Sequence, residues 1–520
     1  MNSNNFCPIG FHNIFLFYQY NMSLFYKCIY IIMLMQYNSV NSINIDSNNL
    51  LLTYLTPIRQ QQSQHYEQQE QPKIGYESYQ RDDNLTFIYI SDPLAVKRNI
   101  TNNNVLLNVN KIDNPFEIIY QWKYLDFEFN TYQRRKLAIS RSEYIPENNL
   151  PLGIDISSDR IFVTTPRWKD GVPASLNFLP KNPNELSPLL QPYPNLDEHG
   201  DPYNPDCNKL ISVYRTQIDE CGRLWCIDSG IVNATVNLNQ ICPPKIVAYD
   251  LNSNKRVVNY NLPPEQIKQE SLHSNIIVDI RDGICNDAYA YVTDVWRYGI
   301  VVYSLARNQS WRTTNHFYYP TPEYSDFNVY GLNFQWPDGA FGMSLSPANG
   351  YKDRLLFFHP MASNKEFAVS TNILRDESLW LPGGSGAPKS VIQIGNRGLN
   401  GQSSTSGISK NQIMFFTLVH RDSVGCWDIN KPYTKQNLNI IAQNDSGIVF
   451  PNDLKIDKDI NQNVWIISNK LPIFLYSQLN YNEINFKIMR ANINNAIKNT
   501  ICNPNIPAIQ NVEPEYEECF

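Results

Sequence analysis

The chain has 520 residues, of which 42% are hydrophobic, 12% aromatic and 18% charged, and its formal net charge is −6. A small net charge that is evenly spread offers no basic stripe for a phosphate backbone, so nucleic acid is excluded as a partner. Thirty-three prolines exclude an architecture of long helices, and the aromatic content suits pleated strands. Length and composition together favour one large repetitive β-fold.

The N-terminal segment has the features of a secretory leader. Met22-Ser-Leu-Phe-Tyr-Lys27 precedes an apolar run from Cys28 to Met35, and small polar residues follow. The run is too short to span a bilayer, so no membrane association is expected. We predict a leader over residues 1–42 with a signal peptide that starts at Met22. The alternative is a longer, weaker leader that starts at Met1.

A low-complexity segment precedes the globular part and an acidic tail follows it. Residues 43–115 are rich in Asn, Gln and Ser and contain few apolar clusters, so they cannot bury enough surface to offset chain entropy. We predict that they form a disordered linker. Residues 506–520 form an acidic tail that is either solvated or held by Cys519.

Between residues 116 and 505, short apolar runs alternate with Pro, Gly, Asn and Asp, which indicates strands and turns. One unit recurs six times: a short strand, a polar turn, and a strongly apolar strand. The six pairs are 153–156 with 160–164, 211–214 with 223–228, 276–279 with 289–294, 342–345 with 354–358, 406–409 with 413–417, and 453–456 with 464–468.

The spacing of these units indicates the fold. They recur roughly every 50 to 65 residues, which leaves room for about four strands in each, the content of one propeller blade. A closed ring of six blades also leaves few exposed strand edges. We therefore predict an all-β fold, a six-bladed β-propeller over residues 116–505. The alternative is a pair of β-sandwiches.

Cysteines and glycosylation motifs indicate an oxidising, secretory route. The ten cysteines include no Cys-x-x-Cys pair, which argues against structural zinc and for disulfides. Five Asn-x-Ser/Thr motifs follow the leader, at Asn84, Asn99, Asn233, Asn308 and Asn444. We predict a secreted, glycosylated protein.

Six sequence segments resemble the insect yellow and major royal jelly proteins, and the resemblance runs in order from about Tyr120 to Cys502. The yellow branch is the more similar of the two. The family implies a six-bladed propeller, in agreement with the repeat. The segments are Leu150–Asp155, Pro166–Asn177, Asp219–Trp225, Asp294–Gly299, Trp336–Pro347 and Phe450–Lys455.

The resemblance also implies a disulfide pattern. Family positions suggest that Cys207 pairs with Cys221, Cys242 with Cys285, and Cys426 with Cys502. Cys226 and Cys519 do not match the family pattern, and they either bridge each other or stay free.

Common catalytic motifs are not found. Gly383-Gly-Ser-Gly-Ala387 lacks the spacing of a nucleophile elbow, and Gly395–Gly401 lacks the spacing of a dinucleotide fingerprint. The seven histidines include no i, i+4 pair for a helical zinc site. We therefore predict no cofactor and no metal, and name no catalytic residue.

The candidate ligand site follows from propeller geometry. Ligands usually meet the opening of the central channel, which the starts of the innermost strands surround. These starts fall near Gly153, Asn275, Phe341, Thr405 and Asn452, a mixture of small, polar and aromatic residues that suits an aromatic amine. Asn469 and Leu471 resemble family positions that line this pocket. A competing interpretation is that Asn452 merely caps a turn.

Three functional classes fit the sequence. The favoured one is a secreted binder of small aromatic amines or catechol-like compounds in pigmentation and melanisation, which the resemblance implies, with no enzymatic activity. The second is a dopachrome-converting, tautomerase-like enzyme, which needs only one positioned acid or base. The third is a structural or nutritive protein. A carboxylate or histidine that projects into the channel would favour the enzyme. The sequence leaves the oligomeric state open.

Overall fold

The computed structural model describes residues 114–201, 203–234, 238–348, 353–381, 387–443 and 447–510. Several sequence predictions lie outside these ranges: the leader over 1–42, nearly all of the 43–115 linker, and the acidic tail from residue 511 with Cys519. The glycosylation motifs at Asn84, Asn99 and Asn444 also lie outside them.

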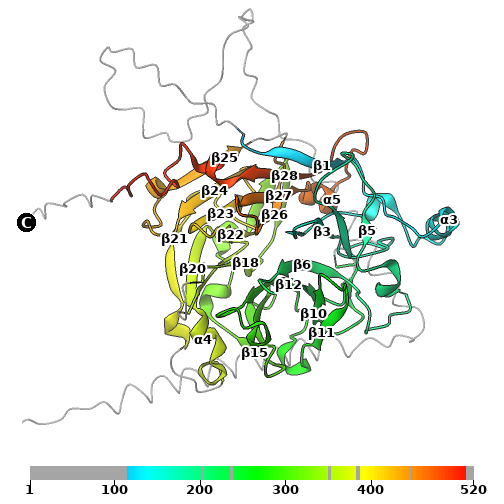
Figure 1. The fold of residues 1–520 in the computed structure, drawn as a ribbon, viewed down its shortest axis with the longest axis horizontal. Helices are drawn as coiled ribbons and strands as arrows, with labels where there is room; N and C mark the ends of the chain where they lie inside the picture. The colour runs from blue at the N-terminus through cyan, green and yellow to red at the C-terminus, as the bar shows by residue number, and fades with distance from the viewer. Residues whose placement is uncertain are drawn as a thin grey trace, which may run out of the picture. The chain divides into compact units, whose positions relative to one another are not determined.

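Six four-stranded antiparallel sheets stand around a common axis, with their innermost strands gathered at the centre (Figure 1). Each of the six strand pairs expected from the repeat supplies the first two strands of one sheet. The innermost strands contact one another in the cyclic order β2, β6, β12, β18, β22 and β26. The prediction of a six-bladed β-propeller is confirmed.

From the axis outward, each blade has four strands. The innermost are β2 (Ile154–Ile156), β6 (Val213–Ile218), β12 (His273–Asp279), β18 (Ala340–Leu345), β22 (Ser406–Ile408) and β26 (Pro451–Ile456). The second are β3 (Arg160–Thr164), β7 (Arg223–Asp228), β13 (Tyr289–Asp294), β19 (Leu355–Pro360), β23 (Ile413–Leu418) and β27 (Asn463–Ser468). The third are β4 (Leu176–Pro180), β10 (Lys245–Asp250), β14 (Gly299–Ser304), β20 (Lys365–Ser370), β24 (Ser423–Asp428) and β28 (Phe486–Asn492). The outermost are β5 (Gln191–Pro192), β11 (Arg256–Asn261), β15 (Gln309–Thr313), β21 (Ile392–Asn396), β25 (Leu438–Gln443) and β1 (Glu117–Trp122).

The ring closes by pairing strands from distant parts of the sequence. β1 is the outermost strand of the blade that otherwise contains β26, β27 and β28, and it pairs antiparallel with β28. The last blade is therefore completed by a strand from the beginning of the domain, which holds the two ends of the ring together. The Cys426–Cys502 disulfide adds a covalent link between the last two blades, as the resemblance implied.

The hydrophobic core lies between neighbouring blades. The second and third strands of each blade are covered on both faces, so their sequences are nearly continuous apolar runs and do not alternate. All six residues of β14 and of β23, for example, are buried. Trp225 and Trp465, each fully buried, are among the largest core side chains. This burial explains why these strands stood out in the sequence.

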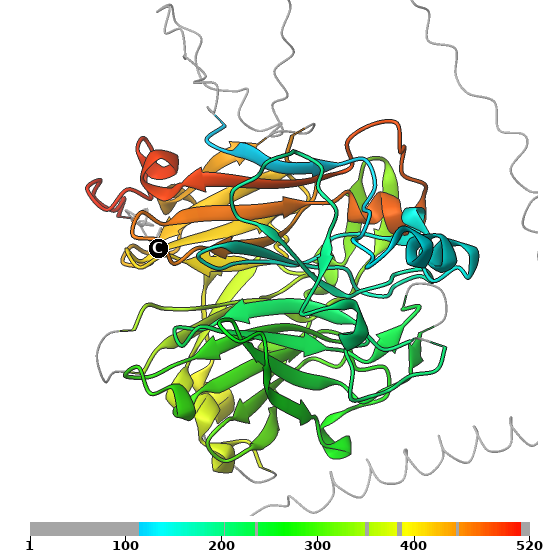
Figure 2. The ribbon, with the colours of Figure 1, turned by 45° about the vertical axis from the view of Figure 1, so that its right-hand side comes forward.

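Within the described ranges, two small hairpins and four α-helices lie at the edges of the blades. Figure 2 shows helix α5 beside the hairpin formed by β16 and β17, and these elements contact each other. The hairpins are β8 (Ile231–Val232) with β9 (Asn239–Gln240), and β16 (Asp326–Val329) with β17 (Leu332–Gln335). The helices are α3 (Tyr132–Ser140), α4 (Thr371–Arg375), α5 (Leu471–Tyr476) and α6 (Ile493–Ile497).

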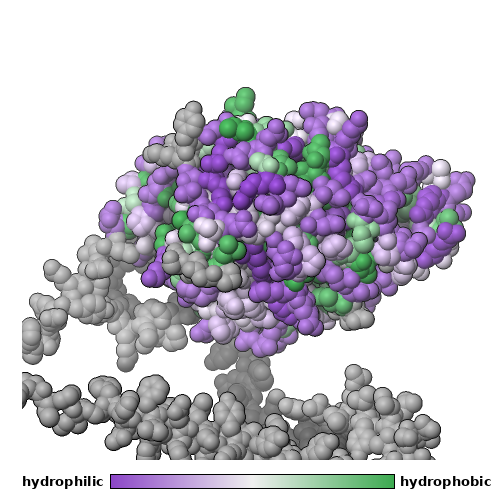
Figure 3. Space-filling model, turned by 90° about the horizontal axis from the view of Figure 1, so that it is seen from below, coloured by the Kyte–Doolittle hydropathy of each residue, from purple (hydrophilic) through white to green (hydrophobic). Residues whose placement is uncertain are grey.

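The surface is mostly hydrophilic in the view from below, with scattered apolar side chains (Figure 3). Isolated exposed apolar residues are normal for a folded domain. Within the described ranges, none of the helices is both long and apolar enough to cross a bilayer.

Two of the three predicted disulfide pairings are wrong. Cys207 pairs with Cys242, and Cys221 pairs with Cys285. The expected Cys207–Cys221 pair fails because the six-residue strand β6 runs between the two cysteines, and at roughly 3.3 Å per residue a strand of this length spans about 20 Å. Cys226 lies buried within β7 and is free; Cys519, its possible partner, is outside the described residues.

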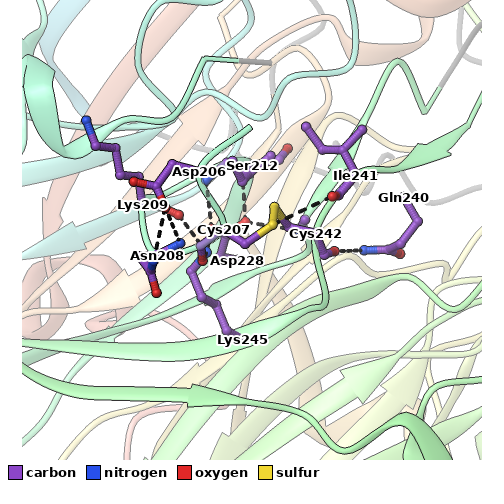
Figure 4. Close-up of a disulfide and its surroundings, with 12 residues drawn as sticks. Asp206, Cys207, Asn208, Lys209, Ser212, Asp228, Gln240, Ile241, Cys242 and Lys245 are labelled. Carbon is purple, nitrogen blue, oxygen red and sulfur yellow. Dashed lines mark hydrogen bonds and ion pairs between the residues drawn. A yellow bond between two sulfur atoms is a disulfide. The ribbon is translucent and has the colours of Figure 1, made fainter. Parts of the chain in front are cut away.

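The network around Cys207 explains its true partner (Figure 4). Lys245, at the start of β10, donates to the carbonyl oxygens of Cys207 and Lys209. Lys245 also forms a fully buried ion pair with Asp228, at 3.1 Å. These bonds hold the Cys207 loop against the start of β10, three residues after Cys242. Spacing along the chain does not reveal this contact.

Peptide mapping tests the revised pairing. A digest of the unreduced protein is expected to contain one linked peptide pair joining Cys207 to Cys242 and another joining Cys221 to Cys285, as detected by mass spectrometry. A Cys207–Cys221 peptide in place of these would contradict the arrangement.

Candidate functional site

Four of the six innermost strands bulge near their starts. Register breaks in β6, β12, β18 and β26 leave extra residues unpaired on the inner strand. A bulge re-aims the side chain that it carries, and bulges are common beside active sites. The bulged residues Tyr214, Ser274, Phe341 and Asn452 all line one cavity.

This cavity has a volume of about 400 Å³ and lies at the end of the channel where the innermost strands begin. We call it the aromatic cavity. Its size falls within the range of small-molecule sites. Loops and the short helix α5 complete its wall with Leu152, Trp168, Ala234, Leu272, Trp296, Gln335, Trp336, Pro337, Asp338, Met361, Ser404, Phe450, Leu471, Leu475 and Tyr476.

Two Trp–Tyr pairs of the cavity are fixed by hydrogen bonds within the wall. The Trp168 indole N–H donates to the Tyr214 hydroxyl at 2.5 Å, and the Trp336 indole N–H donates to the Tyr476 hydroxyl at 2.5 Å. The second bond connects the end of the β16–β17 hairpin to α5. Held in this way, the rings present rigid faces on which a flat ligand can stack.

Asp338 is the one charged side chain among the described residues that line the aromatic cavity. It lies in the loop before β18, and its Oδ1 accepts a hydrogen bond from the Trp296 indole at 3.0 Å. Burial raises the pKa of Asp338 to about 7, although the Trp296 hydrogen bond opposes this shift. Near neutral pH the carboxyl group can therefore both accept and release a proton.

A buried ion pair lies under the cavity. Arg215 of β6 and Asp453 of β26 are both fully buried, and Arg215 Nη1 lies 2.6 Å from Asp453 Oδ1. The guanidinium also lies 5.2 Å from the centre of the Phe341 ring, within cation–π range. The other Asp453 oxygen accepts the Ile154 N–H at 2.9 Å. The pair thus ties β26 to β6 across the short strand β2.

Asn452 is oriented by this pair. Its Oδ1 accepts a hydrogen bond from Arg215 Nη2 at 2.9 Å, and the residue is 2% exposed. Its Nδ2 has no hydrogen-bond partner among the described residues. An unsatisfied buried donor costs about 1–3 kcal/mol, which an acceptor oxygen from a ligand would recover.

A second cavity, of about 600 Å³, opens at the other end of the channel. Along β6, Tyr214 lines the aromatic cavity and Gln217 lines the second, with Arg215 between them. Along β26, Asn452 lines the aromatic cavity and Leu454 lines the second, with Asp453 between them. The Arg215–Asp453 pair therefore stands at the boundary between the two cavities.

The structure brings three of the six predicted ligand-binding residues together: Phe341, Asn452 and Leu471 line the aromatic cavity. Thr405 lines the second cavity, because it lies one residue farther along the chain than Ser404. Whether any of them binds a ligand stays a prediction.

Gly153 and Asn469, the other two predicted ligand-binding residues, are not among the residues that line the aromatic cavity but support its wall. A Cβ at Gly153 would lie 2.7 Å from Thr164 Oγ1 and 2.9 Å from the Tyr214 carbonyl oxygen, so glycine permits the close approach of β2 to β6. Asn469 is fully buried; its amide donates to the Pro151 carbonyl at 2.8 Å and its Oδ1 accepts the Leu471 N–H. Asn469 thereby anchors the start of α5.

Sequence reasoning missed Asp338, Trp296 and Trp336. All three lie in segments that carry the family resemblance, in Asp294–Gly299 and Trp336–Pro347, so a signal was present. They lie in loops before or after strands, whereas the predicted site residues were chosen at the starts of the innermost strands. No group of three or more His, Cys, Asp and Glu that could hold a metal occurs in the part of the chain that the structure describes.

Two predicted glycosylation sites can be placed. Asn308 is exposed at the turn between β14 and β15. Asn233 is half-buried, and its amide donates to Asp170 at 3.2 Å. Both remain predictions.

Comparison with known proteins gives the family. A model described as "Major royal jelly protein" matches residues 211–502. Protein yellow of Drosophila melanogaster is 40% identical over 386 residues, which cover 74% of this chain and 70% of that protein. The chain belongs to the yellow and major royal jelly protein family. The family was recognised correctly from the sequence.

A more similar member of the yellow family is named dopaminechrome tautomerase, also from Drosophila melanogaster. It is 59% identical over 394 residues, which cover 75% of this chain and 85% of that protein. A streptogramin B lyase structure is 15% identical with a TM-score of 0.35, and it covers 66% of this chain and 94% of its own. That likeness is too weak to inform function. The family match spans every residue that lines the aromatic cavity except Leu152 and Trp168.

Proposed function

We propose that this chain is a secreted tautomerase of aminochromes, the cyclised quinones of catecholamines, and that Asp338 is its proton-transferring residue. The observation that carries the proposal is a lone carboxyl group in the wall of an aromatic cavity. A relative 59% identical that is named dopaminechrome tautomerase supports the same reaction class. Three disulfides support passage through an oxidising compartment.

The reaction requires little chemistry from the protein. In dopaminechrome, the two saturated carbons of the five-membered ring each lose one proton, and the two quinone oxygens become hydroxyls. Atoms and electrons are conserved, so the step is an isomerisation that needs no redox partner. A base that removes the two carbon-bound protons in turn and returns each to a quinone oxygen is sufficient.

Asp338 suits this role in its position and its acidity. It lies in the cavity wall, and its pKa of about 7 leaves a substantial ionised fraction at neutral pH and a conjugate acid that is not too weak. The Trp296 indole N–H holds one carboxyl oxygen, so the other oxygen is the one proposed to exchange the proton with the ligand. The rigid Trp and Tyr rings would stack on the flat bicyclic substrate.

A second candidate is the amine binder that the sequence favoured. The same carboxylate and aromatic rings would hold an ammonium group through charge and cation–π attraction. The two candidates differ in outcome: a binder retains serotonin or dopamine and leaves dopaminechrome unconverted.

Turnover of dopaminechrome tests the proposal. The purified protein is mixed with freshly prepared dopaminechrome, and loss of the quinone absorbance and appearance of 5,6-dihydroxyindole are followed against the spontaneous rate. We expect a rate that is saturable and proportional to protein concentration. A rate equal to the spontaneous one, together with calorimetric binding of serotonin, would support the binder instead.

The charge of the cavity predicts selectivity for substrates without a carboxylate. Dopachrome differs from dopaminechrome by a carboxylate on the five-membered ring, and no Lys, Arg or His is among the described residues that line the aromatic cavity. A buried carboxylate without a partner is costly, and ionised Asp338 would repel it. We expect kcat/KM for dopachrome to be at least about 10-fold lower, since like-charge juxtaposition costs several kcal/mol when buried. Equal values for the two substrates would contradict this account of the cavity.

A further inference from the structure

We propose that Asn452 is a second catalytic residue of this site, whose Nδ2 donates a hydrogen bond to a quinone oxygen of the aminochrome as negative charge develops there. This inference rests on the proposed function and extends it from the residue that moves the proton to the residue that stabilises the resulting charge.

The amide of Asn452 has a determined orientation. Arg215 Nη2 donates both to Asn452 Oδ1, at 2.9 Å, and to the Asn452 carbonyl oxygen, at 2.7 Å. A guanidinium offers donors only, so the amide oxygen must face it and the amide nitrogen must point elsewhere. Arg215 is itself fixed by Asp453, in a pair that is completely buried.

The amide nitrogen is unpaired, and the residue that carries it lines the cavity. Asn452 lines the aromatic cavity at the bulge of β26, yet its Nδ2 has no partner among the described residues. The nearby Ser404 hydroxyl donates to the Asn452 carbonyl oxygen at 2.7 Å and so does not satisfy the side chain. Buried donors are nearly always paired, so a ligand oxygen is the acceptor that this arrangement fits.

The reaction supplies such an oxygen. When the base removes a proton from the ring carbon, the electron pair left behind moves through the conjugated ring to a quinone oxygen, which then takes up a proton to become a hydroxyl. A fixed donor at that oxygen stabilises the transition state more than the uncharged ground state. Ionised Asp338 cannot serve in this way, because a carboxylate only accepts hydrogen bonds.

Two substitutions test the assignment. Asn452→Asp keeps the shape and the acceptor that faces Arg215 but replaces the free donor with an acceptor, and Asn452→Ala removes the donor. Each is expected to lower kcat for dopaminechrome by about 100-fold, with a smaller change in KM, as for loss of one oxyanion donor. The Ala variant should retain the wild-type pH dependence.

Asn437→Ala is the control, because Asn437 is fully buried with its amide bonded to Thr434 and Ile509, and Asn437 is not among the residues that line the cavity.

The outcomes separate this inference from the proposed function. Wild-type turnover with both Asn452 variants within about threefold of it would overturn the inference alone, since loss of a real donor costs far more. Absence of wild-type turnover would overturn the proposed function, and the inference with it. If the variants do not fold, a crystal structure of the wild-type protein with 5,6-dihydroxyindole decides. A ring oxygen within about 3.2 Å of Nδ2 supports the assignment, and ring oxygens that face away from Asn452 overturn it.

Discussion

Replacing Asp338 with asparagine is expected to lower kcat for dopaminechrome by about 100- to 10 000-fold, the usual contribution of a general acid–base group. The substitution keeps the acceptor oxygen for the Trp296 indole and the shape of the wall, but the amide cannot take up the substrate proton. Stopped-flow measurement of quinone loss gives kcat directly.

Stability provides the internal control for this variant. Because the pKa of Asp338 is raised above its unfolded value, the folded protein holds the proton more tightly, and the ionised group costs stability as pH rises through about 7. Asp338→Asn should therefore leave the melting temperature unchanged or higher at pH 8. Asp326→Asn, on the exposed hairpin strand β16, is the matched carboxylate control and should retain wild-type turnover. Equal losses in both variants would argue against a role for Asp338 as the base.

Replacing Asp453 with alanine is expected to destabilise the propeller by about 3–5 kcal/mol, the cost of leaving one member of a buried ion pair without its partner. Arg215 would stay fully buried without a counter-charge, and the Ile154 N–H would lose its acceptor. Urea unfolding followed by tryptophan fluorescence measures the difference.

A matched ion pair at the surface supplies the comparison. Glu377 pairs with Arg307 at 3.4 Å, and 39% of the Glu377 side chain and 41% of the Arg307 side chain are exposed. Because exposed pairs contribute at most about 1 kcal/mol, Glu377→Ala should change stability far less than Asp453→Ala. Comparable effects of the two substitutions would show that the Arg215–Asp453 pair is not the structural link proposed for the floor of the cavity.

The fold could be predicted from the sequence because it depends on a repeated local pattern. Strands such as β13 and β27 are buried on both faces, and their apolar runs are visible without knowledge of the neighbours. The disulfides were less predictable, since Cys207 meets Cys242 through a loop that Lys245 and Asp228 hold in place. That contact is tertiary and leaves no mark in the spacing of cysteines.

The cavity was predicted in part, for a definable reason. The predicted starts of the innermost strands identified Phe341 and Asn452 correctly. A shift of one residue along the chain, however, changes which cavity a residue lines, since Ser404 lines the aromatic cavity and Thr405 the second. Bulges set that position, and regular alternation does not reveal them. In the sequence, Asp338 belongs to a Pro-Asp-Gly segment that is typical of a turn. Its raised pKa follows from its burial beside Trp296, which the sequence does not reveal.

The pH dependence of kcat/KM for dopaminechrome tests the central claim most directly. If ionised Asp338 is the base, kcat/KM must rise with pH through a single ionisation near 7 and then level off, after correction for the spontaneous reaction. The Asp338→Asn variant should lack this transition. A wild-type profile that is flat from about pH 5 to 8, or a transition that persists in the variant, would contradict the assignment of Asp338 as the proton-transferring residue.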